Sequence, residues 1–512
     1  MERICSSDDP ADITDFLVIT YTRAAASELK AKIQDAIYSA ISETSLQDTG
    51  RLRHLKRQTL LMQKAHISTI HGFCSGIIRE HADILGIRRD FRLMETTEDT
   101  ELKESVLDRI LEEAYAGADH DPGFLSLTKL LTSSTSDRRL KKTVLDIHES
   151  LQSIPFPDRW IRKQLDMLKS VESAGFVGTE WGRSLLRSSR DTALWSARVL
   201  RSVCLSLSSE PDPPVKWIDG LTAAAAQIES LAAVWEERWE NTFYSSIQFP
   251  RAPRGADKNY PSQKALIEAA KTALKQAAGT ISQSEEDIVR DITASAPAIQ
   301  SLYSLVSAFQ TSYSEEKLQT GRMTYSDLEQ LALKLFCSAE GDSFSDIARS
   351  VSSRFREVLV DEYQDINPVQ EMIVQAVSGH GEQLFCVGDM KQSIYRFRQS
   401  DVSIFKKKYD EFPDYAGQPG EEPVRILLSQ NFRSSRGVVD GINSVFSAIM
   451  SEISPTVNLK CSVSEETVPM TGMRAASCSY PRWRKTAAPM NTAGMRRCAW
   501  PRRSGGWSPT VR

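Results

Sequence analysis

Apolar and polar positions along this chain alternate between short strand-like runs and longer helical stretches. Residues 15–21 (DFLVITY) form a short β-rich run, and Thr22 then opens an Ala-rich segment whose apolar residues recur on one helical face. Residues 65–85 carry STIHGFC at the head of another run of apolar residues at helical spacing. The first of these patterns predicts a strand-to-helix unit, as in an α/β fold, and the second predicts a further helix.

The middle of the chain has a different pattern. From about residue 98 to 320 the spacing is helical almost throughout, with polar or Pro-rich breaks at 132–137, 208–214 and 248–263. Six of the nine Trp residues fall between 160 and 239, where helical spacing favours packing over a ligand site. This stretch predicts a large helical insertion.

The α/β pattern returns after residue 320. Ser326 and Glu329 predict a capping box for a helix that runs through Leu335. Farther along, a loop rich in Pro and Gly at 412–423 precedes an expected strand at 424–428. The residues after that strand are expected to cross into another domain.

The main chemical signal is the apolar run 358–360, which ends in the adjacent acids Asp361 and Glu362. Such a run predicts a strand buried on both faces, which delivers its carboxylates to the edge of a parallel sheet where ligands bind. Asn367, followed by Pro and Gln, predicts the cap of the next helix. A nucleotide-hydrolysing enzyme keeps its metal ligand and its water-orienting base at such an edge.

Length and composition limit the class of protein. With 512 residues the chain is too long for one hydrophobic core and suggests about three or four domains. It is 41% hydrophobic and 25% charged and has no apolar run near the ~20 residues of a membrane span, so a soluble protein without a membrane partner is expected. The start of the sequence lacks the features of a secretory signal, which makes the cytoplasm the expected location.

Charge and cysteine spacing exclude further classes. The eight cysteines are scattered without a CxxC pair, so neither a disulfide framework nor a zinc site is supported. The formal net charge of −4 excludes a strongly basic protein, although it allows a locally basic groove. Nucleic-acid binding therefore has to be argued from particular positions.

Five segments, in order, resemble successive helicase motifs: TYTRAAASELKAKI at 20–33, STIHGFC at 68–74, DEYQDIN at 361–367, GDMKQSIYRFR at 388–398 and QNFRSS at 430–435. Their order and spacing resemble superfamily 1 DNA helicases of the UvrD/Rep/RecB group. Within that group, FRLMETTE at 91–98 and SDVSIFKKKY at 400–409 are most similar to AddA, the helicase-nuclease subunit of bacterial AddAB recombination complexes. The resemblance covers residues 1 to about 450.

The resemblance implies a RecA-like P-loop NTPase lobe with a large helical insertion and the start of a second RecA-like lobe. The expected domains are 1–97 and 321–423 for the two parts of the first lobe, 98–320 for the helical accessory insertion, 424–455 for the start of the second lobe, and 456–512 for a tail.

The resemblance also implies ATP and Mg²⁺ as cofactors and assigns a catalytic set. Asp361 matches the acid that holds Mg²⁺ through water, and Glu362 matches the base that orients the attacking water. Gln392 is similar to the glutamine that senses the γ-phosphate, and Arg433 to the arginine that stabilises its developing charge. Phe432 matches an aromatic residue that stacks on the adenine.

Five further residues, namely Tyr21, Thr69, His71, Tyr395 and Phe397, fall where the family contacts single-stranded DNA. Aromatic stacking tolerates any base, which suits a motor that moves regardless of sequence. Without the motif, Tyr395 and Phe397 alternate as if along a strand and would be core residues, and His71 would be a structural histidine.

The sequence departs from the family pattern at both ends. The GxxxxGK[ST] loop that should precede the first motif is absent, and the nearest imitation, at 178–184, has the wrong spacing and Arg in place of Lys. The chain is therefore expected to begin after its phosphate cradle and to have negligible ATPase activity alone. After Glu466 no acid follows, while Arg and Trp accumulate. This predicts a basic aromatic tail on DNA or, preferably, a shift of reading frame between about 452 and 466.

The expected function is that of an ATP-dependent DNA helicase that moves 3′ to 5′ on single-stranded DNA in double-strand break repair. The complete parent would carry nuclease activity, act on double-stranded DNA and pair with an AddB-like subunit, whereas this chain would be incomplete and weakly active or inactive. Two alternatives remain: a fragment of a free-standing UvrD-like repair helicase, and a non-catalytic module for single-stranded DNA binding or partner docking.

Overall fold

The computed structural model describes residue 4 and residues 10–449, apart from short gaps at 133–135, 236–245, 281–282, 339–340, 416–422, 429–430 and 432–433. These residues all fall within one of the two units of the chain, Met1–Val463. None of the helices described in this range is long and apolar enough to cross a membrane.

A four-stranded parallel sheet, in the order β2-β1-β5-β6, organises the α/β part. Its central strands are β1 (Phe16–Thr20) and β5 (Glu357–Val360), and they are flanked by β2 (His66–Thr69) and β6 (Leu384–Cys386). The strands expected at 15–21 and before Asp361 are thus confirmed. They are also neighbours, since Val18 pairs with Leu359 although the whole helical insertion lies between them in the sequence.

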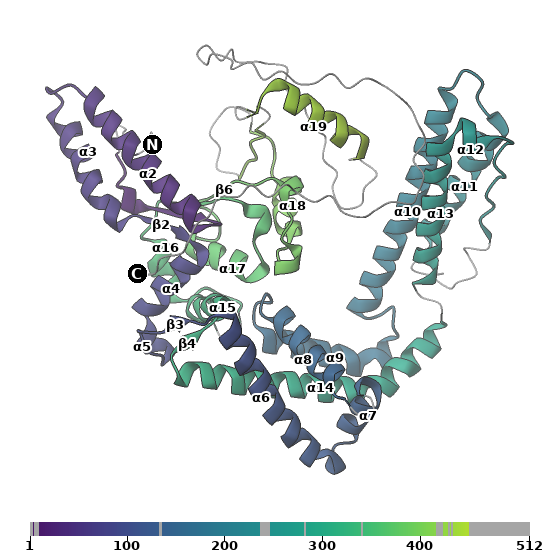
Figure 1. The fold of residues 1–512 in the computed structure, drawn as a ribbon, viewed down its shortest axis with the longest axis horizontal. Coiled ribbons are helices and arrows are strands. Elements are labelled where there is room, and N and C mark those ends of the chain that lie inside the picture. The colour runs from purple at the N-terminus through teal and green to yellow at the C-terminus, as the bar shows by residue number, and fades with distance from the viewer. Residues whose placement is uncertain are drawn as a thin grey trace, which may run out of the picture. The chain divides into compact units, whose positions relative to one another are not determined.

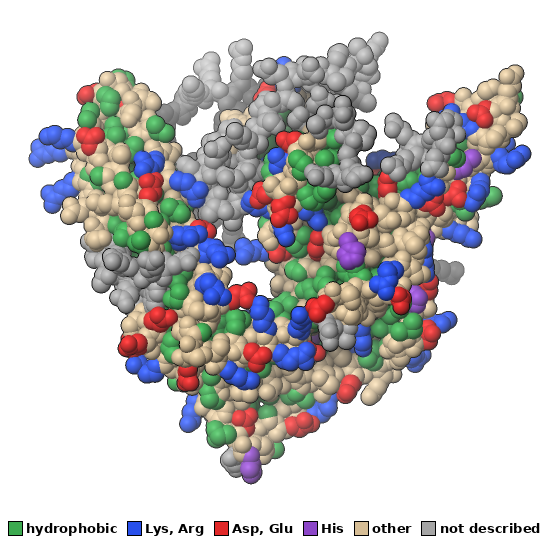
Figure 2. Space-filling model, turned by 180° about the vertical axis from the view of Figure 1, so that it is seen from behind, with side chains coloured by type: hydrophobic (Ala, Val, Ile, Leu, Met, Phe, Trp, Pro, Cys, Tyr) green, Lys and Arg blue, Asp and Glu red, His purple; other side chains and the backbone are tan. Residues whose placement is uncertain are grey.

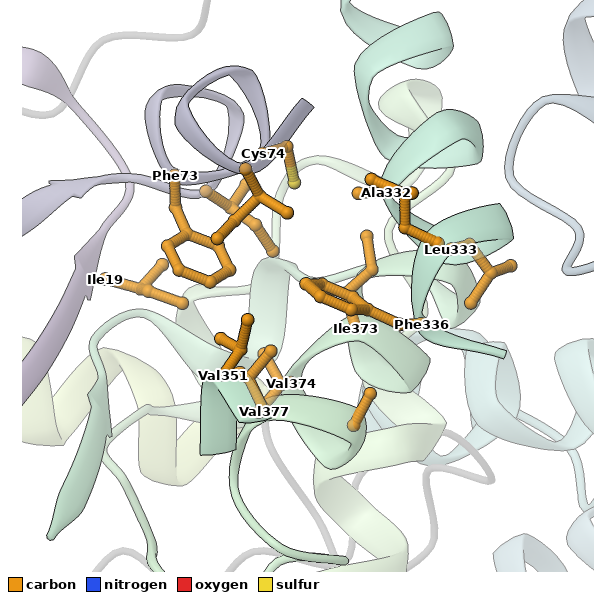
Figure 3. Packing of buried hydrophobic residues seen from close by; sticks show 14 of the residues in the cluster. Ile19, Phe73, Cys74, Ala332, Leu333, Phe336, Val351, Ile373, Val374 and Val377 are labelled. Carbon is orange, nitrogen blue, oxygen red and sulfur yellow. The ribbon is translucent and has the colours of Figure 1, made fainter. Parts of the chain in front are cut away.

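Both faces of the sheet are covered at β1, which is buried at every position. Leu17 and Ile19 pack into one core with Phe73, Phe336 and the helices between residues 325 and 377. Figure 3 shows Ile19, Phe73 and Phe336 in this core. Phe16 and Val18 point to the opposite face and pack into a second core. A strand buried on both faces needs a continuous apolar sequence, and DFLVITY supplies one.

Helices with local capping signals follow the first two strands. Thr22 caps α2 (Arg23–Glu43) by accepting a hydrogen bond from the Ala25 N–H at 3.0 Å. Thr69 caps α4 (Ile70–Glu80) in the same way, through the Gly72 N–H at 3.2 Å. The strand-to-helix unit predicted from Asp15 onward and the helix predicted within 65–85 are therefore confirmed, whereas β2 was not predicted from the sequence. The remaining helices of this region are α3 (Thr49–Leu61) and α5 (Ala82–Leu85).

The predicted helical insertion is confirmed as nine helices in the described residues between β3 (Arg92–Leu93) and β4 (Arg322–Met323): α6 (Thr96–Ala116), α7 (Pro122–Leu131), α8 (Arg138–Leu151), α9 (Pro157–Ala174), α10 (Glu180–Ser208), α11 (Val215–Ala233), α12 (Ala256–Asn259), α13 (Pro261–Gly279) and α14 (Glu285–Gln319). Their apolar faces form two separate cores. The 35-residue α14 packs along α6, α7 and α9 and leads the chain to β4 (Figure 1). Trp217 and Trp235 are buried in one core, as expected of packing residues.

The second part of the α/β region contains α15 (Tyr325–Phe336), α16 (Asp346–Ser352), α17 (Pro368–Val377), α18 (Val402–Glu411) and α19 (Arg436–Ile449). The cap predicted at Asn367 is confirmed: Asn367 and Gln370 form a reciprocal capping box at the start of α17. β3 and β4 pair in parallel and join the two ends of the insertion.

The predicted capping box of α15 is wrong by two residues. Thr324 and Asp327 form the box: the Asp327 N–H donates to Thr324 Oγ1 at 3.2 Å, and the Thr324 N–H donates to Asp327 Oδ2 at 2.7 Å. The reason is that β4 ends at Met323, so the extended backbone turns into the helix directly after Thr324. Glu329 is consequently released from capping and lies buried in the helix.

One strand prediction in the last part is wrong, and the alternative interpretation of Tyr395 and Phe397 as core residues of a strand is not supported either. The expected strand at 424–428 is reduced to an isolated bridge between Arg425 and Asp414, because the described residues provide no neighbouring strand for it. The apparent alternation at Tyr395 and Phe397 belongs to a 3₁₀ turn, Arg396–Arg398, and not to a strand. Phe397 is 74% exposed and is therefore no core residue.

Candidate functional site

The two adjacent acids lie at the carboxyl edge of the sheet, as the sequence predicts. The Asp361 N–H donates to the Ile19 carbonyl at 3.0 Å, and the Tyr363 N–H donates to the Val387 carbonyl at 2.9 Å. These bonds continue the sheet beyond β5, so Asp361 and Glu362 lie where β1 and β6 also end.

Glu362 has an unusual backbone. Its φ of 54° and ψ of 44° place a non-glycine residue in the left-handed region, which costs about 1–2 kcal/mol. Its N–H donates to Asp361 Oδ1 at 3.0 Å, and its carbonyl accepts from the Asp365 N–H at 3.0 Å. Strained residues of this kind are concentrated at functional sites, where surrounding contacts hold them.

A buried glutamine joins the two acidic segments at this edge. Gln364 is 1% exposed; its Nε2 donates to Glu362 Oε2 at 2.8 Å, and its Oε1 accepts from the Asp389 N–H at 2.9 Å. The loop that follows β5 and the loop that follows β6 are thereby fixed to each other. Sequence reasoning missed Gln364, because nothing in its local pattern shows that both ends of the side chain are used.

The neighbouring carboxylates titrate differently from free ones. Burial, together with the nearby Glu362 charge, raises the pKa of Asp365. Asp365 Oδ1 is also a buried oxygen without a hydrogen-bond partner in the described part of the chain. At Asp389 burial acts to raise the pKa, but hydrogen bonds from Lys391 and Gln392 lower it overall. Gln392 is exposed and donates from Nε2 to Asp389 Oδ2 at 3.1 Å.

A cavity of about 720 Å³ opens at this edge. Six of the predicted site residues line it together, namely Tyr21, Thr69, His71, Asp361, Glu362 and Phe397. The helical insertion contributes another wall, through Glu149, Gln152 and Ser153. Of the remaining predicted residues, Tyr395 lies beside Tyr21, Gln392 does not line the cavity, and Phe432 and Arg433 lie outside the described residues.

The aromatic residues beside the cavity form a stacked platform. The rings of Tyr21 and Tyr395 are stacked, with centroids 5.0 Å apart and planes inclined by 23°, and the Phe397 ring lies 5.9 Å from that of Tyr395. The Arg398 guanidinium carbon lies 5.1 Å from the Tyr395 centroid and 5.6 Å from that of Phe397. Exposed rings beside a guanidinium are groups that can stack on bases and attract phosphates.

The face of the molecule drawn in Figure 2 has no single sign of charge, because basic and acidic side chains are interspersed on it. This agrees with the formal net charge of −4. An anionic ligand would therefore be held by local groups, such as Arg398, and less by a long-range field.

His71 lines the cavity and also makes a structural contact. Its Nε2 lies 2.8 Å from Glu329 Oε1, and its ring meets the Tyr325 ring edge-on at 4.8 Å. The imidazole is still 31% exposed. The interpretation of His71 as a hydrogen-bonded histidine is thus confirmed, while its DNA contact stays a prediction.

A buried polar cluster lies deeper along the cavity wall, and sequence reasoning missed it. Lys317, 4% exposed, lies 2.5 Å from Asp327 and has its ammonium 4.0 Å from the Tyr313 ring centroid. The Tyr313 hydroxyl donates to Asp99. Burial, reinforced by the charges of Lys103 and Lys317, lowers the pKa of His148 to about 3.

Some of the groups present suit a magnesium nucleotide. Asp361 offers carboxylate oxygens, which are the ligands Mg²⁺ prefers, and Mg²⁺ usually completes its sphere with water and phosphate oxygens. No group of three or more His, Cys, Asp or Glu side chains in the described ranges could hold a metal ion by itself. The sequence also contains no Gly-rich GxxxxGK[ST] loop to cradle phosphates. Cys74 is fully buried, and burial raises the pKa of its thiol, which disfavours the reactive thiolate.

Comparison with known proteins finds one helicase family and several helicase/nuclease relatives. The pattern of the UvrD/REP helicase N-terminal domain matches residues 7–413. The AddA-type ATP-dependent helicase/nuclease protein of Ruminiclostridium cellulolyticum is 30% identical over 469 residues, which are 88% of this chain and 37% of that protein. The corresponding proteins of Listeria innocua and Pelotomaculum thermopropionicum are 31% and 33% identical, each over 88% of this chain and 36% of the relative. The chain thus spans a little over a third of the length of these relatives.

Proposed function

This chain belongs to the UvrD/REP helicase family, and on that premise we propose that it forms part of the motor of an ATP-dependent DNA helicase of the AddA helicase-nuclease type. The observation that carries the proposal is one cavity in which two features meet. Asp361 and Glu362 lie at its sheet edge, and the Tyr21–Tyr395–Phe397 platform lies beside its opening.

Single-stranded DNA is the ligand that this platform suits. Stacked rings accept any base, and each stacked base contributes roughly 1–3 kcal/mol. Arg398 adds a cation above the same rings. Thr69 and His71, on the adjacent wall of the cavity, would contact the strand as it passes.

The sheet edge would serve nucleotide hydrolysis in the complete motor. Asp361 would hold Mg²⁺ through water and Glu362 would orient the attacking water, while Gln392 and Arg433 would respond to the γ-phosphate and Phe432 would stack on adenine. The strain at Glu362 and its bond from Gln364 support this assignment, since they fix the carboxylate toward the edge.

The domain assignment follows from the same proposal. Residues 1–97 and 321–423 would form the first RecA-like lobe, 98–320 the accessory insertion, and 424–455 the start of the second lobe. The whole protein would move 3′ to 5′ along single-stranded DNA during double-strand break repair, with a nuclease activity and an AddB-like partner subunit, in the cytoplasm.

A second function has a specific observation in its favour. The aromatic platform is complete in the described residues, whereas the sequence contains no phosphate cradle. The 512-residue chain alone would therefore act as a non-catalytic module that binds single-stranded DNA.

The test is equilibrium binding of the full chain to a fluorescent oligo-dT, with a blunt duplex of equal length as the control, followed by ATP turnover with and without the oligonucleotide. Binding of the single strand that weakens as salt rises supports both functions. Turnover stimulated by DNA would establish the motor and exclude the non-catalytic module. Equal or stronger binding to the duplex would overturn the assignment of the platform.

A further inference from the structure

Glu329 on α15 is a buried carboxylate that receives three side-chain contacts from two other helices. Its Oε1 lies 2.8 Å from His71 Nε2 and accepts from Gln370 Nε2 at 2.7 Å, and its Oε2 accepts from Asn367 Nδ2 at 3.0 Å. The residue is 4% exposed. None of the helicase motifs contains it.

A buried carboxylate such as that of Glu329 destabilises the folded protein unless its oxygen atoms accept hydrogen bonds. A buried carboxylate loses its hydration, and the hydrogen bonds of its partners have to compensate. Charge-assisted bonds of this kind are shorter and roughly twice as strong as neutral ones. His71, Gln370 and Asn367 are therefore all held in position by the two carboxylate oxygens of Glu329.

The three donors lead to different parts of the cavity. His71 lines the cavity on the side where Thr69 begins α4, and its imidazole remains partly exposed there. Asn367 ends the loop that starts with Asp361 and Glu362, and its Oδ1 caps α17 by accepting from the Gln370 N–H at 2.8 Å. Glu329 thus stands between the proposed DNA contact and the proposed catalytic loop.

Resting on the function proposed above, we propose that Glu329 is a positioning residue that transmits strand binding at His71 to the loop 361–367. A strand that draws the His71 imidazole toward the cavity lengthens its bond to Oε1. The carboxylate then bonds more closely to Asn367 and Gln370, which holds the end of the loop more firmly. The coupling between His71 and the loop 361–367 passes through the single side chain of Glu329. It requires no change in the β-sheet.

The experiment measures hydrogen–deuterium exchange of the full 512-residue chain with and without oligo-dT. In the unchanged chain, oligo-dT is expected to slow amide exchange in peptides covering 361–370 by about fivefold or more, the scale of a modest coupling between two sites. In Glu329→Gln this slowing is expected to disappear. Oligo-dT affinity itself stays within about threefold, because the stacking platform that supplies most of the binding remains.

A second variant tests the same contact in case Glu329→Gln does not fold. Asn367→Ser keeps a residue that caps helices well but whose shorter side chain cannot reach Glu329. It is expected to abolish the slowing as Glu329→Gln does. Glu113→Gln, at an exposed position of α6, is the matched control and keeps the response of the unchanged chain.

The outcomes separate this inference from the function on which it rests. If the chain binds oligo-dT but the slowing at 361–370 is absent, or persists in both variants, the positioning role is overturned while DNA binding stands. If the variants raise exchange equally with and without DNA, Glu329 is only structural and the inference fails. If the chain does not bind oligo-dT, the proposed function and this inference fail together.

Discussion

Tyr21 and Tyr395 come from segments near opposite ends of the described chain, yet their rings stack with centroids 5.0 Å apart. Tyr21 directly follows β1, and Tyr395 lies in the loop between β6 and α18. The two loops can meet because parallel strands that share a sheet all end at the same edge. The platform for a nucleic-acid base therefore exists only in the folded protein.

Replacing Tyr395 by Ala is expected to weaken oligo-dT binding by roughly 1–3 kcal/mol, the contribution of one stacked base. The change also removes the ring that supports both Tyr21 and Arg398. Fluorescence anisotropy titrations at a fixed salt concentration measure the effect. Tyr38→Ala removes an aromatic ring that is 52% exposed on α2, away from the cavity lining, and should leave affinity unchanged. Equal losses in the two variants would contradict the assignment.

The 512-residue chain is expected to hydrolyse ATP no faster than its Glu362→Gln variant, with or without oligo-dT. The reason is that Asp361 and Glu362 cannot act on a γ-phosphate that no Gly-rich loop and lysine hold in place. A coupled assay of phosphate release compares the two proteins. Turnover by the unchanged chain that vanishes in Glu362→Gln would show that the phosphates are held by other groups.

Gln364→Leu is expected to lower the free energy of unfolding by roughly 1–3 kcal/mol. The substitution leaves the Glu362 carboxylate and the Asp389 N–H without the amide that joins them. Urea unfolding followed by circular dichroism gives the change. Gln34→Leu, at an exposed position of α2, is the control and should stay within about 0.5 kcal/mol. A loss no larger than that of the control would show that the two loops are held by other contacts.

Stability should fall as pH decreases below about 6.5, partly because of His148. Its pKa is near 6.5 in the unfolded chain and is lowered to about 3 in the folded protein, so between these values the unfolded chain binds the extra proton. Protonation then favours unfolding by up to about 1.4 kcal/mol per pH unit. Urea unfolding between pH 7.5 and 5 should give His148→Gln a flatter profile than the unchanged chain. His120→Gln, at an exposed position, should keep the original slope, and identical slopes in all three proteins would refute the prediction.

Much of the fold could be predicted because its signals are local. The caps at Thr22 and Asn367 and the apolar runs of β1 and β5 depend on neighbours within a few residues, and all are confirmed. The helical spacing from about 98 to 320 is also a local property, and it gives the insertion correctly. The assignments of Phe432 and Arg433, and the boundaries of the lobes, remain predictions.

The error at α15 shows where local signals stop being sufficient. Ser326 with Glu329 and Thr324 with Asp327 both have the spacing of a capping box, and only the end of β4 at Met323 decides between them. Because Glu329 does not cap the helix, its carboxylate contacts His71, Asn367 and Gln370. No sequence pattern indicates these contacts.

The sequence by itself determined the strands β1 and β5, the caps at Thr22 and Asn367, the helical insertion and the acids at the sheet edge, because period and capping act over a few residues. Tertiary structure alone decided the stacking of Tyr21 on Tyr395, the left-handed backbone of Glu362 and the burial of Glu329 and Lys317. The physical reason is that a polar or aromatic side chain has its partners on other elements. Whether it is exposed, stacked or buried with its charge compensated is settled only when those elements pack together.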